Sequence, residues 1–322
     1  MRTYIIRRFL LVIPTLFIMS STLFVVYRMI PGDVVDEMVQ RAQNQQGFVE
    51  KDFDIGMMRR ALGLDVPIHI QYFNWWRELV TKGDLGKSLI SNRTLVQEMR
   101  DRLPVTLELA LLGVFFGTLV NTPIGILAAV RQDTKLDYIL RVASMIMAGI
   151  PGFWVMTMVF VYPSIWWGWT PDVVYIPLVR DPIANLRQFI FPAFLGSLAA
   201  FGGGMRFSRA MMLEVLRQDY IRTAWSKGLR ERWIVIRHAI KPTLIPVITG
   251  VGMMIPGLFG GSVITEQIFG LPGMGRLLVS SAISRDYPIV VGYNLLMSTM
   301  VMVFIVFTDI AYAYVDPRIR YR

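Results

Sequence analysis

The residues with the most evident chemical potential lie in one basic stretch, RTAWSKGLRERWIVIRHAIKP, at positions 222–242. One side chain in it, Glu231, is acidic, and six are cationic: Arg222, Lys227, Arg230, Arg232, Arg237 and Lys241. Clustered Lys and Arg side chains can bind carboxylates on a protein surface or anionic lipid headgroups. The stretch therefore predicts a surface that binds an acidic partner or a membrane.

Residue sets for catalysis are absent from the sequence. Cysteine does not occur, which excludes disulfides and thiol chemistry, and the two histidines, His69 and His238, are far apart and form no metal motif. Neither H-E-x-x-H nor G-x-S-x-G occurs, and no G-x-x-x-x-G-K-[ST] phosphate loop is present. We expect no catalytic, metal-binding or cofactor-binding residue in this chain.

Two short helices are predicted to position the basic side chains. Apolar residues before Gly228 recur at amphipathic helical spacing, and Gly228 fits the C′ position that ends such a helix. A second helix is expected over about 231–240, with Pro242 just beyond its end. Three interpretations are open: helices resting on lipid headgroups, a docking helix for a cytoplasmic partner, and a channel linker or voltage element.

The remainder of the chain predicts an all-helical integral membrane protein. Of its 322 residues, 54% are apolar and 17% are charged, against roughly 25% charged residues in an average soluble domain. Six apolar stretches are long enough to cross a bilayer, at roughly 9–30, 105–130, 142–169, 189–213, 243–269 and 289–315. The first is too long for a signal-peptide core and no A-x-A pattern follows it, so we expect it to be retained.

The distribution of Lys and Arg predicts the orientation of these spans. Basic residues gather at the N-terminus, between the second and third spans, in the basic stretch and in the C-terminal tail. With six spans, all four regions fall on one side, which the positive-inside rule makes cytoplasmic. This distribution explains the net charge of +10 better than nucleic-acid binding does.

The fifth predicted span, residues 243–269, contains seven glycines and prolines that disfavour an ideal helix. The sequence is compatible with a broken helix that lines a pathway and with simple close packing between helices. Met253, Met254 and Phe259 are candidate gate residues, because methionine adapts to varied partners.

Three carboxylates lie in or beside predicted spans. Glu266, near the outer end of the fifth span, is either a pathway residue or an interfacial partner of Arg276 or Arg285. Glu108 and Asp309 are expected to be structural partners of basic loop residues.

A series of motifs resembles the permeases of ATP-binding-cassette importers, in the form used by the peptide and nickel class. Their cytoplasmic signature is E-A-A-x3-G-x9-I-x-L-P. In this sequence Arg222-Thr223-Ala224 occupy the E-A-A positions, Gly228 is the signature glycine, and residues 238–241 occupy the I-x-L-P positions. The Glu is absent, as is usual in the peptide class. Further matching motifs, in order, are MIPGD, LGLDVP, QYFNWW, GDLGKS, RLPVTLELA, EQIFGLPGMGRLL, RDYPIVVGYNLL and YVDPRIR. Val34 replaces a usual Pro, and the polar stretch 36–60 is longer than usual.

The resemblance implies a type I importer permease in a prokaryotic cytoplasmic membrane, with both termini cytoplasmic. Expected partners are a second permease, two ATPase subunits that bind ATP and Mg, and an external solute-binding protein. It assigns coupling to the ATPase to these residues: Asp219, Arg222, Thr223, Ala224, Lys227, Gly228, Leu229, His238 and Lys241. Ala224, being small, is expected to let its helix approach the partner closely.

The cargo class follows from the same resemblance. Di- or oligopeptides are the default cargo, and nickel chelates, glutathione or oligosaccharides are the alternatives. A secondary transporter is the main rival function, but neither inverted repeats nor clear mid-membrane charges are present. A channel is disfavoured because no T-V-G-Y-G-type filter occurs.

The predicted organisation has four parts. Residues 1–30 form the tail and first span, and 31–104 form an extracytoplasmic cap. Residues 105–315 form a five-helix permease core with the coupling loop at 214–242, and 316–322 form a cytoplasmic tail.

Overall fold

The computed structural model describes residues 2–29, 32, 34–36, 38–39, 54–170, 175–198 and 200–315. Within helices, the side chains of 2–9, 11–12, 27–28, 251–261 and 307–315 are outside this description. Over the described residues the regular structure is helical, and the β-structure there is one isolated bridge, Lys87 to Thr94. The all-helical prediction is confirmed for this part of the chain.

The chain divides into two compact units. Unit 1 comprises Met1–Pro104 and Arg276–Arg322, and unit 2 comprises Val105–Gly275. Two helices pass from one unit into the other: α5 (Leu95–Val130) and α13 (Met274–Ile283).

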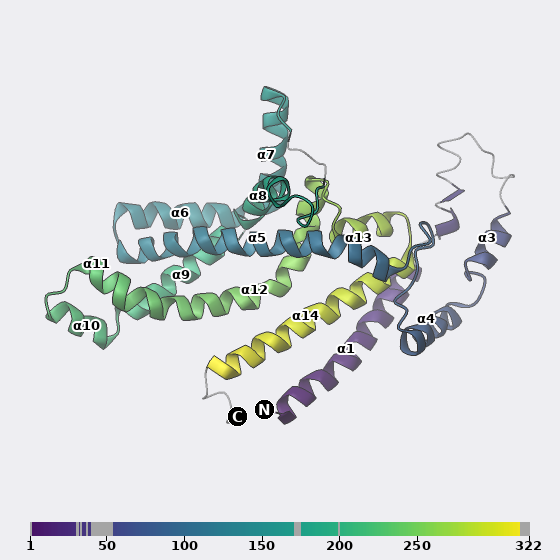
Figure 1. Cartoon of the computed structure of the whole chain (residues 1–322), viewed down its shortest axis with the longest axis horizontal. Coiled ribbons are helices and arrows are strands. Elements are labelled where there is room, and N and C mark those ends of the chain that lie inside the picture. Colours follow the sequence, from purple (N-terminus) through teal and green to yellow (C-terminus); the bar gives the residue numbers. More distant parts are fainter. Residues whose placement is uncertain are drawn as a thin grey trace. The chain divides into compact units, whose positions relative to one another are not determined.

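In unit 1, two long apolar helices lie side by side: α1 (Arg2–Met29) and α14 (Tyr287–Val315) (Figure 1). The predicted cap region contributes two further helices, α3 (Ile55–Ala61) and α4 (Ile68–Lys82). Three buried valines form a small core there with α3: Val34, Val35 and Val39. Residues 40–53, which include much of the polar stretch noted in the sequence, lie outside the described residues.

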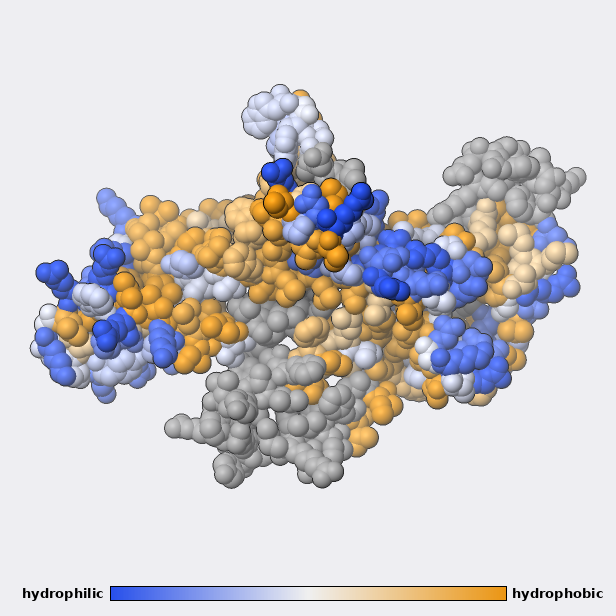
Figure 2. All heavy atoms as spheres, in the orientation of Figure 1, coloured by the Kyte–Doolittle hydropathy of each residue, from blue (hydrophilic) through white to orange (hydrophobic). Residues whose placement is uncertain are grey.

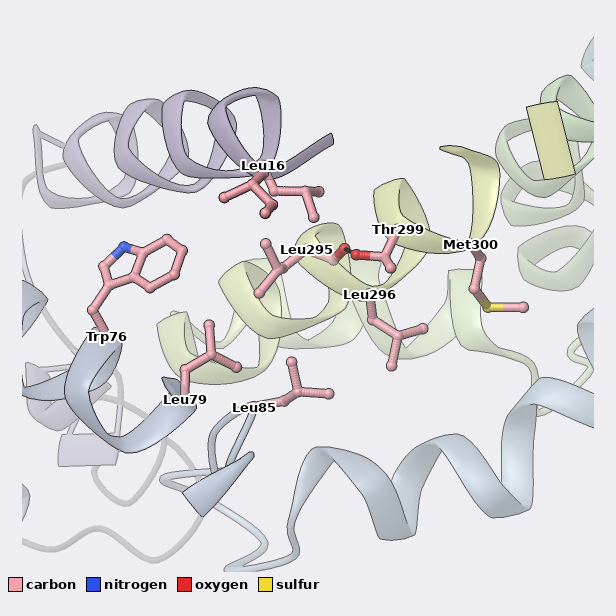
Figure 3. Close-up of a pocket in the computed structure, with 9 residues that line it drawn as sticks. Leu16, Trp76, Leu79, Leu85, Leu295, Leu296, Thr299 and Met300 are labelled. Carbon is pink, nitrogen blue, oxygen red and sulfur yellow. Dashed lines mark hydrogen bonds between the residues drawn. The ribbon is translucent and has the colours of Figure 1, made fainter. Parts of the chain in front are cut away.

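An apolar cavity of about 380 Å³ lies between α1, α4 and α14 (Figure 3). Leu16 of α1, Trp76 and Leu79 of α4, and Leu295 and Leu296 of α14 point into it. Apolar side chains on three helices therefore join α4 to the paired helices of unit 1.

Unit 2 is built around the packing of α9 (Phe201–Leu216) against α6 (Lys135–Gly149) and α12 (Ile240–Ile268). Close approach of α6 and α9 requires Gly202, because a Cβ atom there would lie 2.4 Å from the Ser144 carbonyl oxygen. Small residues at such crossings allow helix backbones to pack tightly in membranes. Over α5 and α6, the face of unit 2 seen in Figure 2 is largely apolar.

Two of the predicted continuous spans are bent, which corrects the sequence prediction. The stretch 142–169 is divided into α6 and α7 (Gly152–Trp167) at an angle of 91°. Pro151 follows Ile150, whose extended backbone is the conformation favoured before proline. The stretch 189–213 is divided into α8 (Pro182–Leu198) and α9, at an angle of 66°.

Long apolar helices account for part of the predicted set of spans. Among the described residues, Leu95–Val130 and Tyr287–Val306 each have the length and hydropathy of a membrane span. Counting each bent pair as one span raises the number to four. These apolar helices are consistent with a protein that resides in a membrane.

Candidate functional site

The basic stretch and its flanks, residues 214–242, form a compact hairpin that we call the basic knob. It contains α10 (Asp219–Ser226), α11 (Glu231–Ile234) and a π-helix, η2 (Val235–Ala239). The hairpin lies at one end of unit 2, beyond the ends of α9 and α12 (Figure 1), where the surface is mostly hydrophilic (Figure 2).

Gly228 makes the turn between the two arms of the knob. Its φ is +73°, and its N–H donates to the Trp225 carbonyl oxygen at 2.9 Å. A Cβ atom added here would contact nothing within 4 Å. The glycine is therefore required for its left-handed backbone and not for close approach within the chain, which confirms the predicted C′ role.

The inner face of the knob has its own hydrophobic core. Ile221, Ile234 and Ala239 are fully buried and cluster with Met212 of α9 and Ala129 of α5. Thr243 adds a polar contact, because its hydroxyl donates to the Ala239 carbonyl oxygen at 2.8 Å. Burial of aliphatic side chains on both arms holds the knob against the ends of α5 and α9.

The predicted coupling residues divide between an outer surface and the core. Seven are exposed: Asp219, Arg222, Thr223, Lys227, Gly228, Leu229 and Lys241. His238 is half-buried. Ala224 is 7% exposed and packs inside the knob, which corrects the expectation that its small size serves a partner. Its size is explained by internal packing.

Exposed aromatic residues of the knob were not recognised as surface residues in the sequence. Trp225 and Trp233 are 48% and 57% exposed, although both are large apolar side chains on the two short helices of the knob. Exposed tryptophans beside basic residues are typical of anchor positions in protein interfaces. The sequence did contain a signal for this exposure. The two short helices carry more large apolar side chains than the small core of the knob can bury.

The second arm of the knob differs from its prediction. It does not end before Pro242; instead α11 continues through η2 into α12, and Pro242 is the third residue of α12. Pro242 therefore lies inside a continuous helical segment, where the wider hydrogen bonding of the π-turn just before it changes the local backbone pairing. The knob is thus joined to α12 without a loop.

An ion pair next to the knob joins α6 to α9. Asp137 is fully buried, and Arg209 donates to both of its carboxylate oxygens at 2.8 Å. The Asp133 N–H donates to the same carboxylate at 3.1 Å, and Arg141 lies 3.4 Å from it. Such a bidentate pair with further hydrogen bonds is the arrangement that keeps a buried charge stable.

Glu266 of α12 is fully buried and belongs to a polar cluster in unit 2. Thr106 donates its hydroxyl proton to Glu266 Oε1 at 2.7 Å and accepts from the Met274 N–H at 2.8 Å. A Cβ atom on Gly273 would lie 2.2 Å from the Glu266 carboxyl carbon, so only glycine fits there. Here Glu266 holds the turn after α12.

The other predicted pathway residues cannot be placed in the same way. The helical backbone of α12 passes through Met253, Met254 and Phe259, but their side chains lie outside the described residues, as does that of Asp309. Glu108 differs from its prediction, since its hydrogen-bond partner is Asn185 and not a basic loop residue. Among the described residues, no group of three His, Asp or Glu side chains could hold a metal ion.

Two family models match the chain. Residues 121–321 match the binding-protein-dependent transport system inner membrane component, and residues 1–110 match the N-terminal region of such membrane components. Together they cover the knob, the bent helices of unit 2 and residues 31–104, which are predicted to form a cap.

Three named relatives match over their full length. The oligopeptide transport system permease protein AppB of Bacillus subtilis (strain 168) is 38% identical over 328 residues, covering 100% of both chains. A putative peptide transport system permease protein of Brucella abortus (strain 2308) is 35% identical over 321 residues, again covering 100% of both. The glutathione transport system permease protein GsiC of Escherichia coli O6:H1 is 32% identical over 322 residues, with the same coverage.

The predicted resemblance is thereby confirmed. The chain belongs to the family of binding-protein-dependent transport system inner membrane components, the permease subunits of ATP-binding-cassette importers, in which other subunits hydrolyse ATP.

Proposed function

We propose that this chain is one of two permease subunits of a peptide importer, and that its basic knob docks on a separate ATPase subunit. The observation that supports this most directly is the knob itself, which buries an aliphatic core and exposes basic and aromatic side chains. ATP and Mg bind to the partner ATPases in this proposal. A second, related permease completes the pathway, and an external solute-binding protein delivers the cargo.

The knob suits a helix-in-groove contact with such a partner. Trp225 and Trp233 provide apolar anchors, and Arg222 and Lys227 can meet carboxylates on the groove. Because η2 runs directly into α12, a displacement of the docked knob is transmitted to α12 without an intervening loop. That movement alternates access to the pathway between the two sides of the membrane.

The proposed membrane architecture has six spans: α1, α5, α6 with α7, α8 with α9, α12 and α14. Residues 31–104 form the external cap, 105–315 the five-helix core and 316–322 a cytoplasmic tail, with both termini cytoplasmic. The pathway is lined by α12, where Met253, Met254, Phe259 and Glu266 are candidate gate residues. The glycines and prolines of α12 support this assignment, because they allow kinks and close approach.

Di- or oligopeptides are the proposed cargo. The relatives named above include oligopeptide, peptide and glutathione permeases, which supports a peptide bond as the shared feature of the transported solutes. The same machinery carrying nickel chelates or oligosaccharides is the alternative. Cargo selection rests with the solute-binding protein.

Substitution of Gly228 tests the coupling role. In the reconstituted importer, Gly228→Val is expected to reduce cargo transported per ATP hydrolysed by about tenfold or more, because a β-branched residue resists φ near +73°. Gly228→Asn is the matched control, since asparagine adopts left-handed backbone readily and should retain most of the transport.

Comparing the two variants distinguishes two causes of a transport loss, an altered backbone conformation at residue 228 and a steric clash with the partner. Equal losses in both would indicate that the partner fills the space beside Gly228 that is open in this chain. Normal transport per ATP in Gly228→Val, at normal expression, would contradict the proposed docking role.

A further inference from the structure

Glu108 of α5 and Asn185 of α8 form an isolated polar pair in unit 2. Asn185 is fully buried, and its Nδ2 donates to Glu108 Oε2 at 3.2 Å and to the Ile176 carbonyl oxygen at 3.0 Å. Each side chain has one further buried oxygen without a hydrogen-bond partner, Glu108 Oε1 and Asn185 Oδ1. Buried acceptors are normally paired, so these two need a donor.

Reversal of the Asn185 amide does not supply one. It would place the amide oxygen against Glu108 Oε2 and the Ile176 carbonyl oxygen, and bring three acceptors together. The orientation in the structure is the one that the two hydrogen bonds from Nδ2 support.

Charged neighbours do not supply a donor either. Among the described residues, no Lys, Arg or His nitrogen forms an ion pair with Glu108. Tyr175 is close enough to interact electrostatically with Glu108, and it carries no positive charge. The ionisable side chains around the start of α8 are exposed: Arg180, Asp181 and Arg187. An ionised Glu108 would therefore be an uncompensated anion in an apolar span, which is costly.

A metal ion fits the pair less well than a proton. Hard cations such as calcium take 6–8 oxygen ligands, whereas the pair offers two unpaired oxygens among the described residues. The nearby Ile176 carbonyl oxygen already accepts from Asn185 and from Gln188 Nε2 at 3.1 Å. A proton on Glu108 Oε1 would make that oxygen a donor. Asn185 Oδ1, on the same amide group that already donates to Glu108 Oε2, is the unpaired acceptor for it.

We propose that Glu108 is a proton-binding site: it is held as a neutral carboxylic acid whose Oε1–H donates to Asn185 Oδ1 while Asn185 Nδ2 donates to Oε2. The acid and the amide then form a ring of two hydrogen bonds. The ring joins α5 to α8 and, through Ile176, to the segment preceding α8, without placing a charge in the span. This inference does not depend on the cargo.

The test uses the importer purified with its partner chains in lipid nanodiscs. Glu108→Gln keeps one donor and one acceptor in the same positions, so its melting temperature should stay within about 2 °C of the wild type. Glu108→Leu removes the partner of Asn185 and should lower the melting temperature by several degrees. Glu98→Gln is the matched control on α5: Glu98 is buried and ion-paired with Arg102 at 2.7 Å, so neutralising it should be destabilising.

Infrared spectroscopy supplies a readout that packing alone would not change. At neutral pH, the wild type minus Glu108→Gln difference spectrum should contain the C=O stretch of a protonated carboxylic acid. Absence of that band would overturn the proposal. Equal destabilisation by Gln and Leu would do so too, as would a wild-type requirement for Na⁺ or K⁺ that Glu108→Gln lacks.

Discussion

Asp137 lies fully buried between α6 and α9, where Arg209 donates two hydrogen bonds to it. Asp137→Asn leaves the largely buried Arg209 without its counter-ion, so we expect a loss of roughly 3–5 kcal/mol in the free energy of unfolding. Thermal unfolding of the purified complex measures this. Glu78→Gln, which removes an exposed ion pair with Lys82, is the control and should change stability by less than about 1 kcal/mol. Similar effects of both substitutions would contradict the assigned importance of the buried pair.

Asp286 is a second buried carboxylate, situated just before α14 in unit 1. Ser88 Oγ donates to it at 2.6 Å and the Leu89 N–H at 3.1 Å, yet burial, reinforced by the charge of Glu98, raises the pKa of Asp286. An acid whose pKa is raised on folding favours the protonated state in the folded protein. Its contribution to stability is therefore present at low pH and is lost as pH rises through the raised pKa.

The pH dependence of stability tests this sign. We expect the melting temperature of the wild type, relative to Asp286→Asn, to decline as pH rises from about 4 to 7. Subtracting the variant removes the titration of the carboxylates that do not interact with Asp286. A difference that is constant or increases with pH would show that the hydrogen bonds from Ser88 and Leu89 outweigh burial.

At the scale of single elements, periodicity and turn chemistry predicted the knob but not its details. Gly228 could be placed as a helix-ending residue because a left-handed turn strongly favours glycine. The inward position of Ala224 and the outward position of Trp225 could not be predicted, because adjacent residues on a short helix both lie at the boundary of its apolar face. Helix α12 was predicted to start after Pro242, because a proline normally ends a helix pattern.

Contacts between residues on elements far apart in the chain could not be predicted from the sequence. Arg209 and Asp137 are 72 residues apart, and Glu108 and Asn185 are 77 apart. Spacing along a helix says nothing about which side chain on another helix lies opposite. The bend at Pro151 could have been anticipated from the proline, but the length of the surrounding apolar stretch favoured one continuous span.

At the scale of the whole molecule, the proposed membrane orientation can be tested directly. The chain contains no cysteine, so a single introduced thiol gives an unambiguous label. In intact cells, a membrane-impermeant maleimide should label Asp181→Cys, in the exposed turn before α8, and should not label Gln132→Cys, in the exposed turn after α5. Permeabilised cells, in which both should react, are the control. The reverse pattern would place the basic knob outside the cell.

The buried core of the knob has a thermodynamic consequence for association. The core of the knob is already packed in this chain by Ile221, Ile234 and Ala239. The surface that a partner binds is therefore preorganised, and binding does not require the free energy of ordering it. Coupled folding and binding produces a large negative heat capacity change from newly buried apolar area. Assembly on this surface should instead show the smaller heat capacity change of rigid-body docking, with an on-rate governed by long-range attraction to its cationic side chains.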